Sequence, residues 1–408
     1  MTFVRVHDKQ SINRPLRGIS LIYLAPVLAL IALSAWAFAS PVGASPDDDY
    51  HLVSTWCADG GGVLCEPGAE GNTRVVASSF RDMLCFAGLP NQSAECQDWG
   101  NGSFETARGN FAGEYPPIFY SAMGVFAGAD IQSSALVMRL ANAALFVALA
   151  TALTCLLPAA RRNTLLWGWL VTLVPLGMFL IPSNNPSGWA ITGVGTAFLA
   201  LLGWFESVGH PRWALGALYL VGVVIAAGAR GDAAVFVIGA TATVLILTAN
   251  RTRHWAFSAL IPAVGVILAL ALLLQSGQVG AGLGGLAGAG VSGAEVAATA
   301  PGPGLVPPDG SLQAPLSGFS LIAYNLLMLP FLWTGVWGTW ELGWFDTDFP
   351  AIVPGAAIAA FVVVAFAGAG RLDWRKAIAV SGVLIVLVAM PLYVLSVSGA
   401  QVGQAFQP

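Results

Sequence analysis

The feature that most constrains this chain is a series of long apolar segments. Crossing the hydrocarbon core of a bilayer takes about 20 apolar residues per helix, and hydrophobic residues make up 56% of the 408-residue sequence. The sequence therefore predicts an all-α, polytopic transmembrane helix bundle with about nine spanning helices, which excludes a soluble globular protein. The predicted spans are 19–39, 134–157, 165–181, 188–205, 213–229, 233–249, 257–275, 351–369 and 377–397.

The basic residues predict the orientation of these spans. If the N-terminus is cytoplasmic, 12 of the 17 lysines and arginines face the cytoplasm, as the positive-inside rule expects. Only three of the 21 acidic residues, Asp8, Glu206 and Asp373, share that side. The 12 basic residues are Arg5, Lys9, Arg14, Arg17, Arg161, Arg162, Arg212, Arg251, Arg253, Arg371, Arg375 and Lys376.

The spans and loops divide the chain into six parts. Ala37-Phe38-Ala39 would suit a signal-peptide cleavage site, but the apolar stretch before it is longer than a usual h-region, so we expect an uncleaved anchor. The parts are a cytoplasmic N-terminus (1–18), the first transmembrane helix (19–39), a large extracytoplasmic loop (40–133), six transmembrane helices (134–275), a second extracytoplasmic region (276–350) and two transmembrane helices with a short outer tail (351–408).

The second extracytoplasmic region has two unlike halves. Residues 277–315 consist largely of Gly, Ala, Pro and Ser without a hydrophobic period, which predicts a mobile segment. Residues 319–336 are apolar enough to cross the bilayer. A crossing there would place Arg371, Arg375 and Lys376 outside, so the charge rule favours a re-entrant or interfacial segment.

Four of the five cysteines lie in the first outer loop: Cys57, Cys65, Cys85 and Cys96. An oxidising compartment permits two disulfides there. The sequence leaves the pairing open; we favour the local bridges Cys57–Cys65 and Cys85–Cys96, and four free thiols is the alternative.

The same loop contains an amphipathic stretch, Arg74 to Phe86. Its apolar residues recur at near-helical spacing, which predicts a helix lying on the membrane surface. Packing within a small loop subdomain accounts for the same pattern equally well.

An acidic cluster follows the first apolar segment after a short elbow containing Pro41, Gly43 and Pro46. Asp47, Asp48, Asp49 and His51 stand together there, although only 9% of the chain is charged. Neighbouring carboxylates raise one another's pKa and can hold a proton, a cation or a substrate hydroxyl. We therefore take Asp47, Asp48 and His51 as candidate catalytic residues. A divalent cation is an open alternative, no cofactor is named by the sequence, and a solvated acidic linker is the alternative without function.

Two arginines are placed at the outer ends of apolar segments. Ionisable side chains at membrane depth are costly unless they are paired or face a cavity, and the guanidinium fork suits phosphate oxygens. Arg139 and Arg230 are therefore candidate substrate-binding residues. Snorkelling of Arg139 and a local pair of Arg230 with Asp232 are the structural alternatives.

Three further polar or aromatic groups are expected on the same surface. Tyr115 belongs to "YPPIFY", which predicts a stiff turn and an interfacial anchor. Asn185 in "PSNNPSGW" would cap a helix or bind a sugar hydroxyl. Asp346 lies in "GWFDTDFP". The sequence shows no nucleotide loop, zinc ligand set or Ser/His/Asp triad, and we expect no nucleic-acid partner.

Together these motifs resemble known membrane enzymes. Acidic residues just after the first helix and a Tyr-Pro-Pro-aromatic entry to the next resemble the GT-C glycosyltransferases, multi-helix enzymes that use polyprenyl-phosphate sugars at the outer face. The chain more closely resembles an uncharacterised bacterial membrane family, the domain-of-unknown-function family twenty-one forty-two. The matching pieces are Pro46-Asp47-Asp48-Asp49-Tyr50-His51, Tyr115-Pro116-Pro117, Arg139-Leu140, Asn185-Pro186-Ser187, Arg230-Gly231-Asp232 and Gly343-Trp344-Phe345-Asp346-Thr347.

The resemblance implies a GT-C-like glycosyltransferase of the bacterial plasma membrane, with membrane lipids and a polyprenyl-phosphate sugar as partners. Asp47 would be the general base, with Asp48 as an alternative or a metal partner, and Asp232, Asn185, Tyr115 and Asp346 would join the arginines at the substrate. A non-catalytic membrane scaffold and a transporter or lipid flippase are the rival functions. Related proteins continue beyond "SGAQVGQAFQP", so we expect a truncated form of the family.

Overall fold

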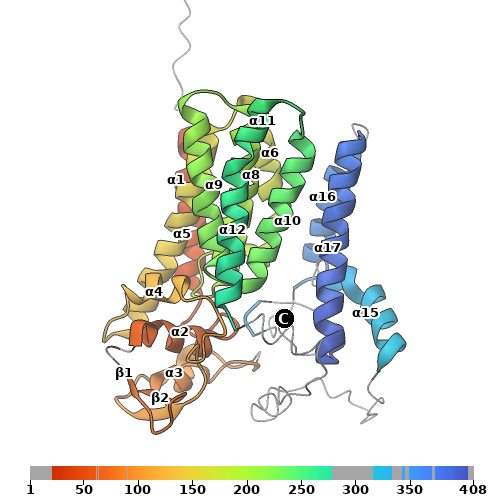
Figure 1. Cartoon of the computed structure of the whole chain (residues 1–408). Helices are drawn as coiled ribbons and strands as arrows, with labels where there is room; N and C mark the ends of the chain where they lie inside the picture. Colours follow the sequence, from red (N-terminus) through yellow and green to blue (C-terminus); the bar gives the residue numbers. More distant parts are fainter. Residues whose placement is uncertain are drawn as a thin grey trace, which may run out of the picture.

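Long helices stand side by side in one bundle, and the short elements of the first predicted outer loop gather at one of its ends (Figure 1). The computed structural model describes residues 21–60, 62, 64–89, 91–277, 316–332, 342–344, 349–369 and 373–402. The predicted mobile segment 277–315 lies almost entirely outside the described residues. The chain is mostly helical, as its apolar segments predict.

The elements follow one another in a simple order. The helices are α1 (Leu21–Ala39), α2 (Asp48–Trp56), α3 (Ser79–Asp82), α4 (Ile118–Gly124), α5 (Ile131–Leu156), α6 (Ala159–Thr172), α7 (Pro175–Leu180), α8 (Ser187–Glu206), α9 (His210–Ala227), α10 (Gly231–Thr248), α11 (Arg253–Ser258), α12 (Leu260–Gln275), α15 (Gly318–Leu332), α16 (Ile352–Ala369) and α17 (Trp374–Ser398), and the strands are β1 (Cys65–Pro67), β2 (Arg74–Ala77) and β3 (Ser103–Thr106).

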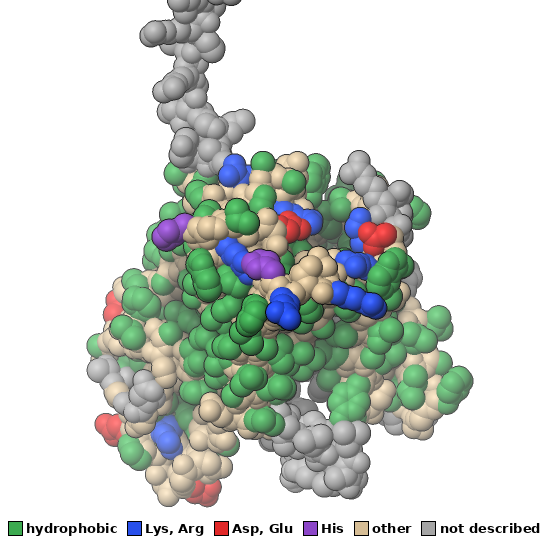
Figure 2. Space-filling view, turned by 45° about the horizontal axis from the view of Figure 1, so that its top comes forward, with side chains coloured by type: hydrophobic (Ala, Val, Ile, Leu, Met, Phe, Trp, Pro, Cys, Tyr) green, Lys and Arg blue, Asp and Glu red, His purple; other side chains and the backbone are tan. Residues whose placement is uncertain are grey.

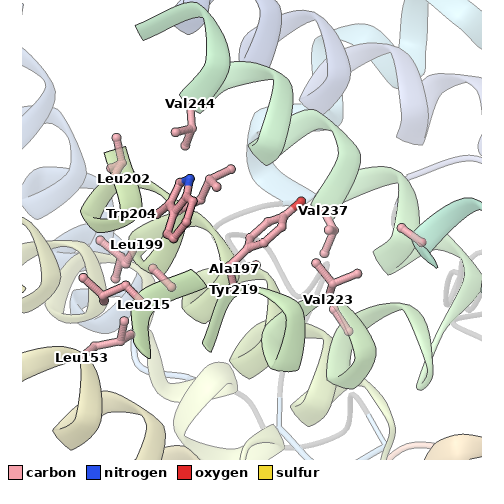
Figure 3. Close-up of a cluster of buried hydrophobic side chains, with 14 of the residues drawn as sticks. Leu153, Ala197, Leu199, Leu202, Trp204, Leu215, Tyr219, Val223, Val237 and Val244 are labelled. Atoms are coloured by element: carbon pink, nitrogen blue, oxygen red, sulfur yellow. The ribbon is translucent and has the colours of Figure 1, made fainter. Parts of the chain in front are cut away.

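The bundle is built around the α8–α9 pair. Trp204 of α8 and Tyr219 of α9 are buried with the branched side chains of their neighbours, and Val237 and Val244 of α10 close the cluster (Figure 3). The polar atoms of these two rings are satisfied: the Trp204 indole donates to the Ser258 carbonyl at 3.0 Å, and the Tyr219 hydroxyl lies 3.0 Å from the Thr241 hydroxyl. Outward-facing side chains of the same helices stay apolar and exposed, as a lipid environment requires.

Within the part of the chain that the structure describes, six helices are long and apolar enough to cross a bilayer. They are α5, α8, α9, α10, the continuous stretch Arg253–Gln275 formed by α11 and α12, and α17. Three shorter apolar helices, Leu24–Ala39, Gly318–Pro330 and Ile352–Gly368, accompany them. The predicted number of nine spans is therefore not confirmed, whereas several membrane-crossing helices are shown.

One predicted span is not a continuous helix. The sequence prediction placed a single helix at 165–181, but the structure ends α6 at Thr172 and starts α7 at Pro175. Proline has no amide hydrogen to donate, and it keeps the residue before it in an extended conformation. Val174 accordingly has φ −61° and ψ 166°. The break was not predicted because the segment is apolar on both sides of it.

Residues 40–130, which we call the loop subdomain, are not purely helical. An antiparallel sheet in the order β1–β2–β3 pairs Cys65 with Val76 and Val76 with Phe104. The predicted membrane-surface helix over 74–86 is wrong, because this stretch forms β2 and the short α3. Phe80 and Met83 are fully buried in the subdomain core, so the alternative of packing within the subdomain is correct.

Both favoured disulfides form in the structure. Cys57 pairs with Cys65 and Cys85 pairs with Cys96, with Cα atoms 5.4 and 6.0 Å apart. The first bridge ties the end of α2 to β1. The second closes the segment that follows α3, so both restrain parts of the subdomain that have little core of their own.

Charge separates the two ends of the bundle. Figure 2 shows lysine, arginine and histidine side chains gathered at the end opposite the loop subdomain. Arg161 there binds Glu206 at 2.5 Å, and Arg212 stacks on Trp204 at 4.2 Å. This is the arrangement from which the positive-inside rule predicts a cytoplasmic face.

The segment predicted to be re-entrant begins as α15, which packs on α17. Its 15 residues measure about 22 Å at 1.5 Å per residue, less than the hydrocarbon core of about 30 Å. Asn325, fully buried, donates to the Ala400 carbonyl and accepts from the Val402 amide. These two hydrogen bonds therefore hold α15 against the segment that follows α17.

Candidate functional site

The acidic cluster sits at the start of α2, against the bundle. The elbow after α1 turns at Gly43, with φ 85°, and at Asp47, with φ 56°. Aspartate is one of the few residues other than glycine that tolerate this left-handed conformation. Asp47, at the left-handed position, is followed by Asp48 and Asp49. The structure gives each of these three carboxylates a different environment.

Asp48 points inward and organises the elbow. Its Oδ2 accepts hydrogen bonds from the Gly43 amide at 3.1 Å and the Ser45 amide at 3.3 Å, and its side chain is 0% exposed. The same oxygen lies 3.4 Å from the Arg139 guanidinium of α5, whose side chain is 3% exposed. The pair is therefore a buried ion pair.

Arg139 also binds the end of α1. It donates to the Ser40 carbonyl at 2.6 Å and to the Pro41 carbonyl at 2.9 Å. The last carbonyls of a helix lack partners within the helix. One guanidinium thus covers this helix end and joins α1, α5 and the acidic cluster, which gives Arg139 a positioning role beneath the site.

Asp47 and Asp49 share one arginine from the far side of the subdomain. Arg108 donates to Asp47 Oδ1 at 2.7 Å and to Asp49 Oδ1 at 3.1 Å, and its Nε also contacts Asp49. Asp47 Oδ2 has no hydrogen bond to the described residues. Burial raises the pKa of Asp47, against the opposing charge of Arg108.

Aromatic rings enclose the cluster on one side. His51 Nδ1 lies 2.9 Å from the Tyr120 hydroxyl, and its ring contacts Tyr50 and Tyr115 edge-on. Burial holds the pKa of His51 well below its usual range, assisted by the charges of Arg230 and Arg108. The imidazole is therefore neutral at physiological pH.

Arg230, at the start of α10, stands beside these aromatic rings. It forms a two-point pair with Asp232 at 2.9 and 3.0 Å and donates to the Ser187 hydroxyl of α8 at 3.0 Å. Its guanidinium lies 5.7 Å from the Tyr115 ring, and its charge acts on Asp47. The local Arg230–Asp232 pair weighed from the sequence does form, and it points the arginine at the cluster.

One asparagine of the α7–α8 connection, Asn185, holds the elbow in place. Asn185 donates to the Pro46 carbonyl at 3.0 Å and accepts from the Ser187 amide at 2.9 Å. Asn185 thus bonds the first amide of α8 from the position before the N-cap, which is Pro186, and it also holds the residue before Asp47. A residue far along the chain also holds the elbow: the Trp344 indole donates to the Gly43 carbonyl at 2.7 Å.

The family model for a predicted membrane protein, DUF2142, matches residues 30–408. The chain belongs to the DUF2142 family. No curated protein and no solved structure is significantly similar to it. Membership of DUF2142 establishes a membrane protein and assigns no activity, so the chemistry has to be argued from the site itself.

In this DUF2142 protein the structure brings most of the predicted site residues together. Asp346 lies outside the described residues, the two terminal nitrogens of Arg139 bond with Asp48 and the elbow, and the Asn185 amide bonds with Pro46 and Ser187. Within the described ranges, no group of three or more His, Cys, Asp or Glu side chains is arranged to hold a metal ion. The residues that come together around the elbow are Asp47, Asp48, His51, Tyr115, Asn185, Arg139, Arg230 and Asp232.

Sequence reasoning missed Arg108, Tyr120 and Trp344. Arg108 lies about 60 residues from the aspartates that it binds, in a stretch without a motif. Tyr120 was part of "YPPIFY" but was assigned to a membrane anchor. The one available signal for Arg108 was charge balance, because an outer loop with so many acids contains few basic residues to neutralise them.

The buried Asp48 predicts a pH dependence of stability. Burial raises its pKa to about 6, against Arg139 and the two elbow amides. Between about pH 4 and 6 the folded protein therefore keeps a proton that the unfolded chain has lost, so the free energy of unfolding falls as pH rises through this window. We expect wild type to lose stability relative to Asp48→Asn across this window, and no further above it.

Thermal unfolding of both proteins in detergent, from pH 4 to 7.5, measures this difference. Asp98→Asn, an exposed acid of the same subdomain, is the control and should run parallel to wild type. Parallel curves for wild type and Asp48→Asn would show that Asp48 does not take up a proton on folding.

Proposed function

We propose that this DUF2142 protein is a GT-C-like glycosyltransferase that uses a polyprenyl-phosphate sugar at the outer face of the bacterial plasma membrane. The observation that carries the proposal is the position of Asp47. Its carboxylate stands at the bundle end opposite the basic face, between the charges of Arg108 and Arg230, and one of its oxygens has no bond to the described residues.

Asp47 suits the role of general base better than its neighbours. Its side chain is 31% exposed, against 17% for Asp49 and 0% for Asp48, so a substrate reaches it most easily. A carboxylate whose pKa is raised binds a proton more readily, which brings it closer to the working pH of a base. Asp48 shapes the elbow instead, through its bonds to the backbone.

The reaction needs an anion-binding group beside that base. In the proposed step the acceptor hydroxyl oxygen attacks the anomeric carbon and loses its proton to Asp47, while the bond from that carbon to the phosphate oxygen breaks. Negative charge then develops on the leaving polyprenyl phosphate. Arg230 is placed to stabilise it, since it stands at the N-terminus of α10, where the helix dipole also favours anions.

The rival function that the contacts also support is a non-catalytic scaffold. Arg108 and Arg139 occupy the acids in ion pairs, and such pairs also serve only to hold a fold together. The two functions differ in the use of Asp47 Oδ2. A glycosyltransferase would use this oxygen to accept the acceptor's proton, whereas a scaffold has no role for it.

The deciding experiment measures transfer from polyprenyl phosphates carrying radiolabelled mannose, glucose or arabinose to a bacterial membrane fraction. Asp47→Asn should lower the rate by about 10²–10⁴-fold, the usual contribution of a general base. Asp49→Asn is the matched control, because it removes a partner of the same Arg108 and should leave most of the rate.

Two results would sink the proposal. One is equal rates for wild type and Asp47→Asn. The other is a folded wild-type protein, with both disulfides intact, that transfers none of these sugars; that result would favour the scaffold.

A further inference from the structure

A second polar region of the loop subdomain lies away from the acidic cluster. A cavity of about 420 Å³ opens between the sheet, the turn around residues 99–103 and the first turn of α5. Pockets that bind small molecules have volumes of about 300–1,000 Å³. The cavity is therefore large enough for a small organic ligand, and none of the candidate site residues lines it.

The alternation of the strands explains why the sheet has a free face. Val76 is 1% exposed and packs into the subdomain core together with Phe104. Side chains one residue away in a strand point to the opposite face. Val75, Ala77 and Ser103, which pairs with Ala77, accordingly line the cavity, and Val76 between them also borders it.

The walls carry polar groups that are free to bind. Trp99 is half-buried against the core, so its ring is held in place while one side faces the cavity. Asn101 and Gln132 are exposed. Among the described residues, the Trp99 indole nitrogen and these two side-chain amides have no hydrogen-bond partner. A fixed aromatic ring and free amides thus surround one space.

The charge of the lining residues limits which classes of ligand the cavity can bind. Glu66 and Asp130 contribute carboxylates, and no lysine or arginine is among the described lining residues. Asp130 is engaged by Ser133 at the start of α5. Phosphates and acidic ligands would be repelled here, whereas neutral hydroxyl groups could donate to Glu66.

We propose that this cavity binds a neutral oligosaccharide. A sugar presents apolar C–H faces that pack on an aromatic ring such as Trp99, and hydroxyl groups that bond with Asn101, Gln132 and Glu66. The combination of one ring, amides and a carboxylate without cations matches this chemistry better than it matches a lipid or a nucleotide.

The cavity is close enough to the acidic cluster to serve the same chain of sugars. Ser103 lines the cavity, and Arg108, five residues further along, binds Asp47. An extended chain advances about 3.3 Å per residue, so the backbones of Ser103 and Arg108 lie within about 17 Å of each other. The role of the cavity as the acceptor subsite rests on the proposed function; binding itself does not.

The test is binding without transfer. The full chain in nanodiscs is titrated, without any lipid donor, with neutral mannan, galactan and glucan oligosaccharides of two to six sugars, and with an acidic polygalacturonate of matched length. Saturation-transfer NMR reports which ligands bind. We expect at least one neutral series to bind and the acidic one to bind weakly or not at all.

Variants then locate the site. Trp99→Ala should weaken binding at least about tenfold, and Asn101→Ala and Gln132→Ala should each weaken it less. Trp167→Ala, an exposed tryptophan of α6, should bind like wild type. If Trp99→Ala fails to fold, the two amide variants decide, since their side chains are exposed.

Each outcome separates this inference from the proposed function. Binding that survives Asp47→Asn but disappears in the cavity variants supports the cavity even when no sugar is transferred. Preference for the acidic oligosaccharide, absence of neutral binding by the folded chain, or binding unaffected by all three cavity variants would overturn it, whatever the transfer assay shows.

Discussion

Replacing Arg139 by alanine should lower the free energy of unfolding by about 3–5 kcal/mol, the usual cost of removing one partner of a buried ion pair. The change leaves the Asp48 carboxylate buried without its guanidinium. It also removes the Arg139 donor from the Ser40 carbonyl, and from the Pro41 carbonyl, which keeps only the Ala44 amide. Arg139→Lys should recover only part of the loss, because one ammonium cannot reach all three acceptors in the geometry of the planar fork.

Denaturant unfolding in mixed micelles measures the effect. A cycle with Asp48→Asn and the double variant isolates the pair, and we expect the two single losses to add up to more than the loss of the double variant. Arg251→Ala, an exposed arginine at the opposite end of the bundle, is the control and should change stability by less than about 0.5 kcal/mol. Equal losses in the free energy of unfolding for Arg139→Ala and Arg251→Ala would show that Arg139 does not stabilise the fold.

The second large effect is expected at the crossing of α8 and α9. A Cβ built on Gly222 would lie 2.8 Å from the Ala197 nitrogen and from the Gly193 oxygen, and a Cβ on Gly193 would lie 2.5 Å from the Ala226 nitrogen. These neighbours are backbone atoms, so a helix has to move. Gly222→Leu should therefore cost more than the 1–3 kcal/mol that is typical of overpacking in a core, and we expect little folded protein.

Gly239→Leu is the matched control. It makes the same change within the spanning helix α10, where a Cβ would meet nothing within 4 Å. The yield of monodisperse protein by size-exclusion chromatography, followed by thermal unfolding, compares the two. Similar yields would mean that α8 and α9 can separate without loss, contrary to the close crossing.

This crossing was readable in the sequence but was not predicted. Gly193-x-x-x-Ala197 and Gly222-x-x-x-Ala226 are small residues four apart, the pattern that allows membrane helices to approach closely. The same pattern alone does not name its partner helix. The pairing of α8 with α9 required the tertiary structure.

What the sequence determined by itself is what depends on local composition. Apolar length alone predicted membrane-crossing helices, because lipid requires about 20 residues whatever the neighbours are. The separation of charge along the chain predicted the basic bundle end. The short spacing of Cys57 to Cys65 and of Cys85 to Cys96 favoured the pairs that form.

What the tertiary structure decided depends on contacts between distant residues. Three adjacent aspartates look alike in sequence, yet Asp48 is buried against Arg139 while Asp47 keeps a free oxygen beside Arg108. Residues 74–86 have a helical period, but pairing with β1 and β3 makes their first four residues a strand. The roles of the acids and the face of the sheet that borders the cavity follow from partners in other elements of the chain, which no local pattern specifies.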